Sequence, residues 1–139
     1  MTLVRLVYAS RATDQMQTHD IVAILEAAKR NNGKLGVTGM LIFNSAYFLQ
    51  CLEGPRMAVN HIYQNIAADK RHAQPVLLDY REISERRFHQ WTMGYIGEDK
   101  FLAEHLLRYS GTDQFNPFEM SGESAHSLLL AAAEELPTI

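Results

Sequence analysis

The sequence predicts an α+β protein built as a ferredoxin-like sandwich with two additional C-terminal helices. One observation is an alternating, strand-like segment close to the N-terminus. A second is the order of the segments that follow, which is strand, helix, strand, strand, helix, strand, strand. This βαββαββ order is typical of one sheet with two helices on one face. A third is that the residues after 97 change from strand-like to helical patterns. We therefore expect a sandwich over 1–97 and a helical extension over 98–139.

The first two elements are predicted from periodicity. Residues 3–9 alternate and are rich in β-branched and aromatic side chains, which predicts a strand with Tyr8 at its inner end. A helix is expected to begin near Asp20 with Thr18 as its cap, since an acidic side chain suits the positive end of a helix. The run Asn31-Asn32-Gly33 is expected to end this helix, because these residues tolerate the left-handed conformation.

The following segments predict a hairpin, a second helix and two more strands. Residues 36–44 and 46–53 form the hairpin, which turns near Asn44. Gly54-Pro55 breaks the second of these strands and opens the helix, because proline is tolerated in a first helical turn. The last two strands are expected at about 76–83 and 88–96, and helices of the extension at 100–109 and 121–136. This extension could cover the other face of the sheet or bind a partner.

Composition excludes several classes of function. Apolar residues make up 47% of the 139 residues, as in a globular domain, and the net charge of −3 predicts no basic face for nucleic acid. No apolar stretch approaches the ~20 residues of a membrane span, and the N-terminus lacks the features of a secretory signal. Cys51 is the only cysteine, and no two of the six histidines share a helical spacing that suits a metal. We therefore expect a soluble, cytoplasmic protein without a metal site.

Gln50 is the polar residue least expected at its position. Both faces of its strand are apolar, so its carboxamide is expected to be buried, and leaving it without partners would cost about 1–3 kcal/mol. In the predicted topology the first and third strands are neighbours, so Gln50 could meet the Tyr8 hydroxyl, which also needs a partner when buried. The ordinary alternatives are a structural glutamine and a core tyrosine.

Three further groups each have an ordinary and a functional interpretation. Asn31 and Asn32 could cap the first helix, or could bind a heterocycle that carries both donors and acceptors. The run Asp69-Lys70-Arg71-His72 could complement the dipole of the second helix, or could hold a phosphate. Trp91 and Met93 lie two apart on one face of the last predicted strand, where ordinary packing is the alternative.

Five short segments combine these residues in one order along the chain. They are Arg5-Leu6-Val7-Tyr8-Ala9-Ser10, Asn31-Asn32-Gly33, Gly36-Val37-Thr38-Gly39, Phe48-Leu49-Gln50-Cys51-Leu52-Glu53-Gly54 with Asp69-Lys70-Arg71-His72, and Trp91-Thr92-Met93-Gly94. Together they resemble the BLUF domain, a blue-light sensor that uses flavin adenine dinucleotide (FAD). The resemblance covers about residues 2–97, and the remainder resembles the two-helix extension of short, stand-alone members.

The resemblance implies a flavin site between the two helices. Ile24 and Ile66 would lie on the two faces of the ring, and Asn32 would bind its C4 carbonyl and N3 edge. Asn31 would lie near the pyrimidine side or the cofactor tail. Gln50 would lie between Tyr8 and the N5/O4 edge of the flavin.

The resemblance also assigns the rest of the site. Arg71 and His72 would lie near the ribityl-phosphate end, and Trp91 or Met93 would approach Gln50. Asn65 stands where some relatives place an arginine for the phosphate, which leaves binding of FMN or riboflavin in vitro open beside FAD. The full set of cofactor-binding candidates is Tyr8, Ile24, Asn31, Asn32, Phe48, Gln50, Ile66, Asp69, Arg71 and His72, and the photoactive candidates are Tyr8, Gln50, Trp91 and Met93.

The implied function is that of a photoreceptor and not of an enzyme. Electron and proton transfer from Tyr8 and rearrangement of Gln50 would change the hydrogen bonds of the flavin, and a homo-oligomer would signal to a separate downstream protein. A flavin enzyme would need an open substrate pocket and a base or nucleophile beside the ring, and the sequence offers no such group near Gln50. A cofactor-free binding module is the second alternative, because ferredoxin-like folds host many functions.

Overall fold

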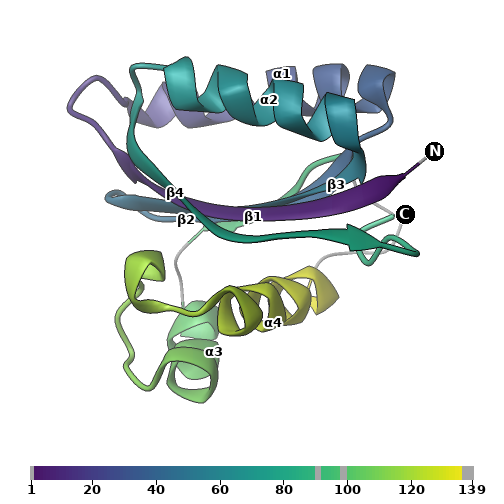
Figure 1. The fold of residues 1–139 in the computed structure, drawn as a ribbon. Helices are drawn as coiled ribbons and strands as arrows, with labels where there is room; N and C mark the ends of the chain where they lie inside the picture. The colour runs from purple at the N-terminus through teal and green to yellow at the C-terminus, as the bar shows by residue number, and fades with distance from the viewer. Residues whose placement is uncertain (1, 90–91, 98–99, 136–139) are drawn as a thin grey trace.

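The computed structural model describes residues 2–89, 92–97 and 100–135 and has the predicted order of elements. Figure 1 shows three layers, with α1 and α2 on one face of the sheet and α4 on the other. The elements are β1 (Leu3–Ala12), α1 (Thr18–Leu35), β2 (Thr38–Phe43), β3 (Tyr47–Pro55), α2 (Arg56–Ala68), β4 (His72–Ile83), β5 (Gly94–Gly97), α3 (Lys100–Ser110), the short 3₁₀ helix η1 (Pro117–Glu119) and α4 (Gly122–Glu134). The ferredoxin-like prediction with C-terminal helices is confirmed.

The sheet places the first and third strands side by side, as predicted. Its strand order is β4-β1-β3-β2-β5, and β5 runs parallel to β2 while the other pairs are antiparallel. In the central pair, Tyr8 of β1 lies directly opposite Gln50 of β3. Directly opposed residues of an antiparallel pair project to the same face, so the two side chains are brought together by register alone.

Two hydrophobic cores lie on the two faces of the sheet. Alternation along β1 and β3 sends Tyr8, Phe48 and Leu52 toward α1 and α2, where they join one buried cluster. The residues between them join a second cluster with α4, which includes Val7, Leu49, Cys51, Leu128 and Leu129. The extension therefore covers the other face of the sheet, which is one of the two roles expected for it. None of the helices in the described ranges is both long enough and apolar enough to cross a membrane.

The ends of α1 differ from the prediction. The helix begins at Thr18 and its N-cap is Gln17, whose backbone N–H donates to the Asp20 carboxylate over 2.8 Å. The helix continues to Leu35, and Gly36 then adopts the left-handed conformation at φ 72°. The predicted ending at Asn31-Asn32-Gly33 is wrong, because Gly36 adopts positive φ without a steric cost and lets the helix run one turn further.

The last two strands also differ from their predicted bounds. β4 begins at His72, because its first residues pair with the end of β1 and Pro75 is tolerated on an edge strand. β5 covers only Gly94–Gly97, so the predicted strand over 88–96 is wrong in its first part. Phe88 instead packs in the core beside α4, and Met93 lies in a bend before β5. Trp91 lies outside the described residues.

A bulge in β4 lies opposite Tyr8 and contacts α4. The pairing shifts between Val7 and Tyr8, so Leu78 is an extra residue between Asp79 and Leu77. Gly122, the first residue of α4, packs so closely on this bulge that a Cβ atom there would lie 2.3 Å from the Leu78 carbonyl oxygen. The start of α4 is therefore fitted to the backbone of the sheet.

Candidate functional site

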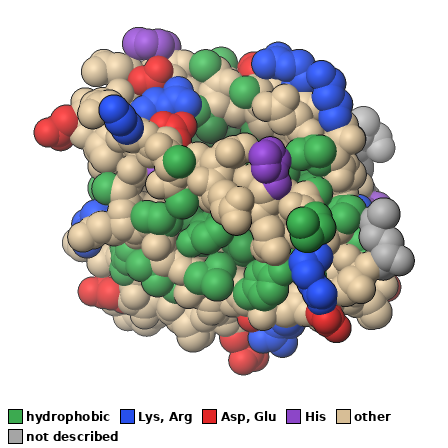
Figure 2. All heavy atoms as spheres, turned by 45° about the horizontal axis from the view of Figure 1, so that its top comes forward, with side chains coloured by type: hydrophobic (Ala, Val, Ile, Leu, Met, Phe, Trp, Pro, Cys, Tyr) green, Lys and Arg blue, Asp and Glu red, His purple; other side chains and the backbone are tan. Residues whose placement is uncertain are grey.

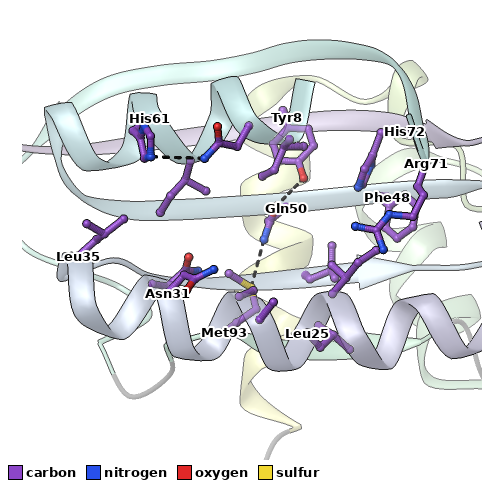
Figure 3. Close-up of a pocket in the computed structure, with 18 of the residues that line it drawn as sticks. Tyr8, Leu25, Asn31, Leu35, Phe48, Gln50, His61, Arg71, His72 and Met93 are labelled. Carbon is purple, nitrogen blue, oxygen red and sulfur yellow. Dashed lines mark hydrogen bonds between the residues drawn. The ribbon is translucent and has the colours of Figure 1, made fainter. Parts of the chain in front are cut away.

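A cavity of about 430 Å³ lies between α1, α2 and the sheet. This volume is within the range of small-molecule sites. Nine of the ten predicted cofactor-binding residues line it, and Asp69 does not; Met93 also contributes to the wall. The nine are Tyr8, Ile24, Asn31, Asn32, Phe48, Gln50, Ile66, Arg71 and His72, several of which are labelled in Figure 3.

Gln50 bridges Tyr8 and Met93 at the wall of this cavity (Figure 3). The Tyr8 hydroxyl donates to Gln50 Oε1 over 2.5 Å, and Gln50 Nε2 donates to Met93 Sδ over 3.3 Å. Tyr8, Gln50 and Met93 are 1%, 6% and 2% exposed, so these bonds are made away from bulk water. The expected meeting of Tyr8 and Gln50 is confirmed. Trp91 and Met93 were the two candidates to approach Gln50, and Met93, the one that lies within the described residues, contacts it.

The Tyr8 hydroxyl holds its proton firmly. Burial raises the pKa of Tyr8 far above its usual range, and the nearby Tyr63 phenol and Asp69 carboxylate, which would repel a second negative charge, raise it further. The rings of Tyr8 and Tyr63 lie 5.4 Å apart. Simple acid–base release of the Tyr8 proton is therefore strongly disfavoured. Loss of an electron from the phenol makes this proton acidic, so Tyr8 is suited to lose both together.

The two asparagines near the end of α1 differ in exposure. Asn32 is 3% exposed, and its Nδ2 donates to the Thr92 carbonyl over 3.2 Å, which ties α1 to the segment before β5. No hydrogen bond of its Oδ1 or its second N–H occurs among the described residues, so these groups are candidates for binding a ligand. Asn31 lines the same cavity from an exposed position. Since Gly36 is the C-cap residue, neither amide is used as a C-cap.

At the other end of the cavity, Arg71 is paired with carboxylates. Its Nη2 lies 2.7 Å from Asp69 Oδ2, and its Nη1 lies 3.9 Å from Asp20 Oδ1. The hydrogen bond from Arg71 lowers the pKa of Asp69, and the same bond raises the pKa of Arg71. Asp69, predicted to bind a cofactor directly, thus contacts Arg71 and does not line the cavity.

His72 lies beside Arg71 in a drier position. Its Nδ1 lies 2.9 Å from the Ser10 hydroxyl, and its ring lies 4.6 Å from that of Phe48. Burial lowers the pKa of His72, which favours the neutral ring. Arg71 is therefore the permanent positive charge at this end of the cavity, and His72 adds a neutral, hydrogen-bonding edge.

Some lining residues were not predicted as site residues. His61 is one of them, and its Nε2 lies 3.4 Å from Nδ2 of Asn65, the residue that the resemblance places at the phosphate position. Leu25, Leu41 and Ile62 supply apolar wall. Leu25 and Ile62 belong to apolar helical stripes, but a stripe alone does not tell which members face a cavity and which face the core. Over the described ranges, no group of three or more His, Cys, Asp or Glu side chains could hold a metal ion.

Comparison with known families gives one match over most of the chain. The family model "BLUF: Sensors of blue-light using FAD" matches residues 3–94. Photoactivated adenylate cyclase subunit beta of Euglena longa is 39% identical over 93 residues, which cover 66% of this chain and 11% of that protein. The blue light- and temperature-regulated antirepressor BluF of Escherichia coli (strain K12) is 38% identical over 86 residues. These residues cover 62% of this chain and 21% of the antirepressor, so the chain spans a small part of both relatives.

Two solved structures resemble this chain over nearly its whole length. The photo-activated state of BlsA superposes with a TM-score of 0.87 at 27% identity, covering 99% of this chain and 98% of BlsA. The dark state of BlrB, a BLUF protein, superposes with a TM-score of 0.81 at 33% identity, covering 97% of this chain and 98% of BlrB. The similarity therefore includes the C-terminal helices as well as the sandwich.

Proposed function

Because this chain belongs to the BLUF family of blue-light sensors that use FAD, we propose that Tyr8 and Gln50 are its photoactive pair. The observation that carries the proposal is the hydrogen-bonded row from Tyr8 through Gln50 to Met93 at the cavity wall. These three side chains are buried and hydrogen-bonded one to the next. Their phenol, carboxamide and thioether groups can therefore exchange hydrogen-bond partners without bulk water. Residues 1–97 form the flavin-binding part of this proposal, and residues 98–139 form the output extension.

The residues at the cavity fit a flavin. Ile24 of α1 and Ile66 of α2 supply apolar walls from the two helices, which suits the two faces of a flat ring. Asn32 and Gln50 present donors and acceptors, as the polar edge of a flavin requires. Arg71 supplies a positive charge for the phosphate end of FAD. The Arg71 guanidinium also pairs with Asp69 and Asp20, which weakens its hold on a phosphate. FMN and riboflavin are therefore expected to bind in vitro as well.

The mechanism follows from the hydrogen bonds of Gln50. A bound flavin would supply the absorption of blue light and, when excited, the oxidising power, and Tyr8 would be the residue that gives up an electron and a proton to it. Gln50 would then turn or tautomerise, because its amide carries both donors and an acceptor, which can bond to new partners once the neighbouring groups change theirs. Tyr8 regains the electron and the proton, and the new arrangement of Gln50 persists. No covalent bond is formed or broken between protein and ligand in this cycle.

Output is proposed to pass through the segment before β5 and through α4. Met93 bonds to Gln50, and α4 shares a core cluster with β1 and β3 on the opposite face of the sheet. A changed bond at Met93 would alter this packing and thereby the binding of a separate downstream protein. The Escherichia coli relative is an antirepressor and the Euglena longa relative a cyclase subunit, so the sensor part serves different outputs in them. This chain itself is proposed to be a sensor without enzyme activity.

Self-association is proposed through the exposed edge of the sheet. β4 is an edge strand, and its exposed large hydrophobic side chains are Val76, Leu77 and Tyr80. Figure 2 shows hydrophobic side chains gathered on one face of the molecule among scattered charged groups. Exposed apolar edge strands tend to pair with another chain. Light scattering should give a mass above 15.8 kDa for the wild type, and Tyr80→Glu should lower it.

The proposal is tested by the visible spectrum of the protein purified with flavin available. A yellow protein whose absorption band moves slightly to the red in blue light, and returns in the dark, would support it. A colourless protein would contradict it and favour a cofactor-free binding module. Steady turnover of a nicotinamide donor in the dark would instead favour a flavin enzyme.

A further inference from the structure

Glu53 is a completely buried carboxylate on the face of the sheet opposite to the cavity. It lies in β3 three residues after Gln50, and none of its surface is exposed. A buried carboxylate must be compensated by strong hydrogen bonds. Glu53 Oε1 accepts the N–H of Phe88 over 2.7 Å, and Oε2 accepts the N–H of Arg87 over 2.9 Å. Two consecutive backbone N–H groups thus form a small anion-binding nest around it.

Arg86 fixes the same segment to two strands. Its Nη1 donates to the Glu53 carbonyl and to the Thr38 hydroxyl, each over 3.0 Å. Its Nη2 donates to the Gly36 carbonyl over 2.6 Å. Residues 86–88 are therefore held against Gly36, β2 and β3 by hydrogen bonds in which the Arg86 guanidinium or the Glu53 carboxylate takes part. Hydrogen bonds that involve a charged group are the stronger ones in proteins.

The segment fixed by Glu53 contacts α4 on one side and leads to the cavity on the other. Phe88 is fully buried, and its ring meets that of His126 edge-on at a centroid distance of 6.1 Å. Five residues later, Met93 accepts the N–H of Gln50, and the neighbouring Thr92 carbonyl accepts the N–H of Asn32. The residues that respond to Gln50 and those that touch α4 therefore belong to one short stretch of chain.

We propose that Glu53 is a positioning residue of the light-sensing site, which holds residues 86–88 so that rearrangement at Met93, five residues further on, is passed through Phe88 to α4. The proposal rests on the proposed function, since Gln50 must rearrange for a displacement to arise. A loosely held segment would absorb the change at Met93 locally. A segment fixed at residues 86–88 instead transfers it to the Phe88–His126 contact, because packed cores shift between discrete arrangements.

The test compares three variants of the full-length, flavin-loaded protein. Glu53→Gln keeps the shape of the side chain but places an amide NH₂ against one of the two backbone N–H groups. Arg86→Ala removes the guanidinium from a partly exposed position and leaves Glu53 unchanged, so it is expected to fold even if Glu53→Gln does not. Glu82→Gln is the matched control, because it makes the same chemical change in an exposed carboxylate that pairs with Arg56.

Two measurements separate positioning from a purely structural role. The first is the ¹³C-methyl NMR signal of Met93 in the dark, which needs no photochemistry. We expect it to shift or broaden in Glu53→Gln and Arg86→Ala, and to stay unchanged in Glu82→Gln. The second is the light-minus-dark difference in amide hydrogen exchange along α4. We expect this difference to be lost in Glu53→Gln and Arg86→Ala while the red shift of the flavin remains, and to be restored in part by Glu53→Asp.

The outcomes distinguish this proposal from the proposed function. An unchanged Met93 signal in both Arg86→Ala and Glu53→Gln would overturn the role of Glu53, even if the wild type responds to light. An α4 exchange difference that survives in both variants would overturn it as well. A wild type without any light-induced red shift, together with a displaced Met93 signal in the variants, would instead reject the proposed photocycle and support Glu53 as the residue that positions Met93.

Discussion

The two ends of the Gln50 side chain are chemically different, and each already has a buried partner. Oε1 accepts from Tyr8, and Nε2 donates to Met93. If the amide turned end for end, an NH₂ group would face the Tyr8 hydroxyl and a carbonyl would face the sulfur of Met93. The sulfur has no proton to donate, so the displaced carbonyl needs a donor elsewhere. Rearrangement of Gln50 therefore requires its neighbours to change partners too.

Replacing Tyr8 by Phe is expected to abolish the lasting red shift while flavin remains bound. The ring still fills the wall of the cavity, but no hydroxyl remains to supply a proton or to hold Gln50. Stability should fall by about 1–3 kcal/mol, because the buried Gln50 carbonyl loses its donor. Absorption spectra before and after blue light, together with urea denaturation, measure both effects.

Tyr63→Phe is the matched control for this substitution. Tyr63 lies 5.4 Å from Tyr8 between ring centroids and is partly buried, but no hydrogen bond joins it to Gln50 among those described. Its light-induced shift should remain. A red shift that persists in Tyr8→Phe, or one that disappears equally in both variants, would contradict the role given to Tyr8.

The central pair of the site could be predicted from sequence, whereas the pairing of the charged residues could not. Strand alternation and the order of elements bring Tyr8 and Gln50 to one face of neighbouring strands. Asp69 and Arg71, in contrast, stand two apart at the end of a helix, from where their side chains can turn toward the cavity or toward each other. The rotamers keep Arg71 at the cavity wall while its guanidinium pairs with Asp69, and this pairing leaves the Asp69 carboxylate outside the cavity lining.

At the level of elements, the helices and strands were predicted more reliably than their ends. Hydrophobic periodicity specifies that an element exists, but its end depends on one or two hydrogen bonds and on local backbone conformation. Gly36 ends α1 because it alone among the described residues of this turn has positive φ, although three earlier residues also suit a helix end. β5 begins only at Gly94, whereas the predicted strand began at about 88, because Glu53 binds the backbone N–H groups of Arg87 and Phe88, which are then not used in a strand ladder. This is a long-range contact that no local pattern contains.

Replacing Gly122 by Ala is expected to destabilise the protein by about 1–3 kcal/mol through overpacking. Alanine usually improves a helix, but here its Cβ would lie 2.3 Å from the Leu78 carbonyl oxygen and 3.0 Å from Asp79 Cβ. The backbone of the bulge cannot move aside without disturbing β4. Thermal or urea denaturation measures the change, and hydrogen exchange should show it concentrated in α4.

Gly33→Ala is the control with the opposite expected sign. Gly33 lies within α1, and among the described residues its added Cβ would meet only the Thr92 methyl at 3.5 Å, an ordinary contact. The variant should be more stable by about 0.5–1 kcal/mol, since alanine is the better helix former. If both variants gained stability, the proposed close fit between α4 and the bulge would be refuted.

At the level of the whole molecule, α4 gives the sheet a second core, and this core contains a histidine. His126 is 8% exposed. In the part of the chain that the structure describes, its Nε2 is the only buried side-chain nitrogen or oxygen atom without a hydrogen-bond partner. The pKa of His126 is lowered to about 4, chiefly by burial and to a smaller extent by the charges of Arg5, Arg87 and Arg81, against the opposing effect of Asp79. The folded protein therefore keeps this ring neutral.

Stability is expected to fall as the pH decreases from about 6.5 to about 4. Over this range the unfolded chain protonates His126 near its usual pKa, whereas the folded chain does not, so protons favour unfolding. The contribution is on the order of 1–2 kcal/mol, because partial solvent screening reduces the ~1.4 kcal/mol expected for each unit of pKa shift. Urea denaturation at several pH values measures it.

His126→Leu isolates this contribution from that of other groups. The substitution removes both the proton site and the unsatisfied nitrogen, so the variant should be at least as stable as the wild type at pH 7 and should lose less stability at pH 4.5. His72, whose pKa burial also lowers, remains as a background in both proteins. An identical pH dependence in the two proteins would show that His126 does not titrate on unfolding.

The overall topology could be predicted from the order of elements, but the place of the extension could not. An apolar helix such as α4 needs a surface to cover, and sequence alone allows either the sheet or another protein to provide it. The structure resolves this through many small contacts, of which the fit of Gly122 on Leu78 is one. Such contacts are specific to three-dimensional packing and leave no periodic pattern.

The single thiol of the chain lies in the core that α4 closes. Cys51 is fully buried, and burial raises the pKa of its thiol, so alkylating reagents should find it inert while the helix stays in place. The reactivity of the Cys51 thiol therefore reports whether α4 has moved away from the sheet. If illumination loosens α4, maleimide uptake at Cys51, followed by mass spectrometry, should be several-fold faster in blue light than in darkness, without any engineered label. Equal uptake rates would mean that α4 remains seated during the light response.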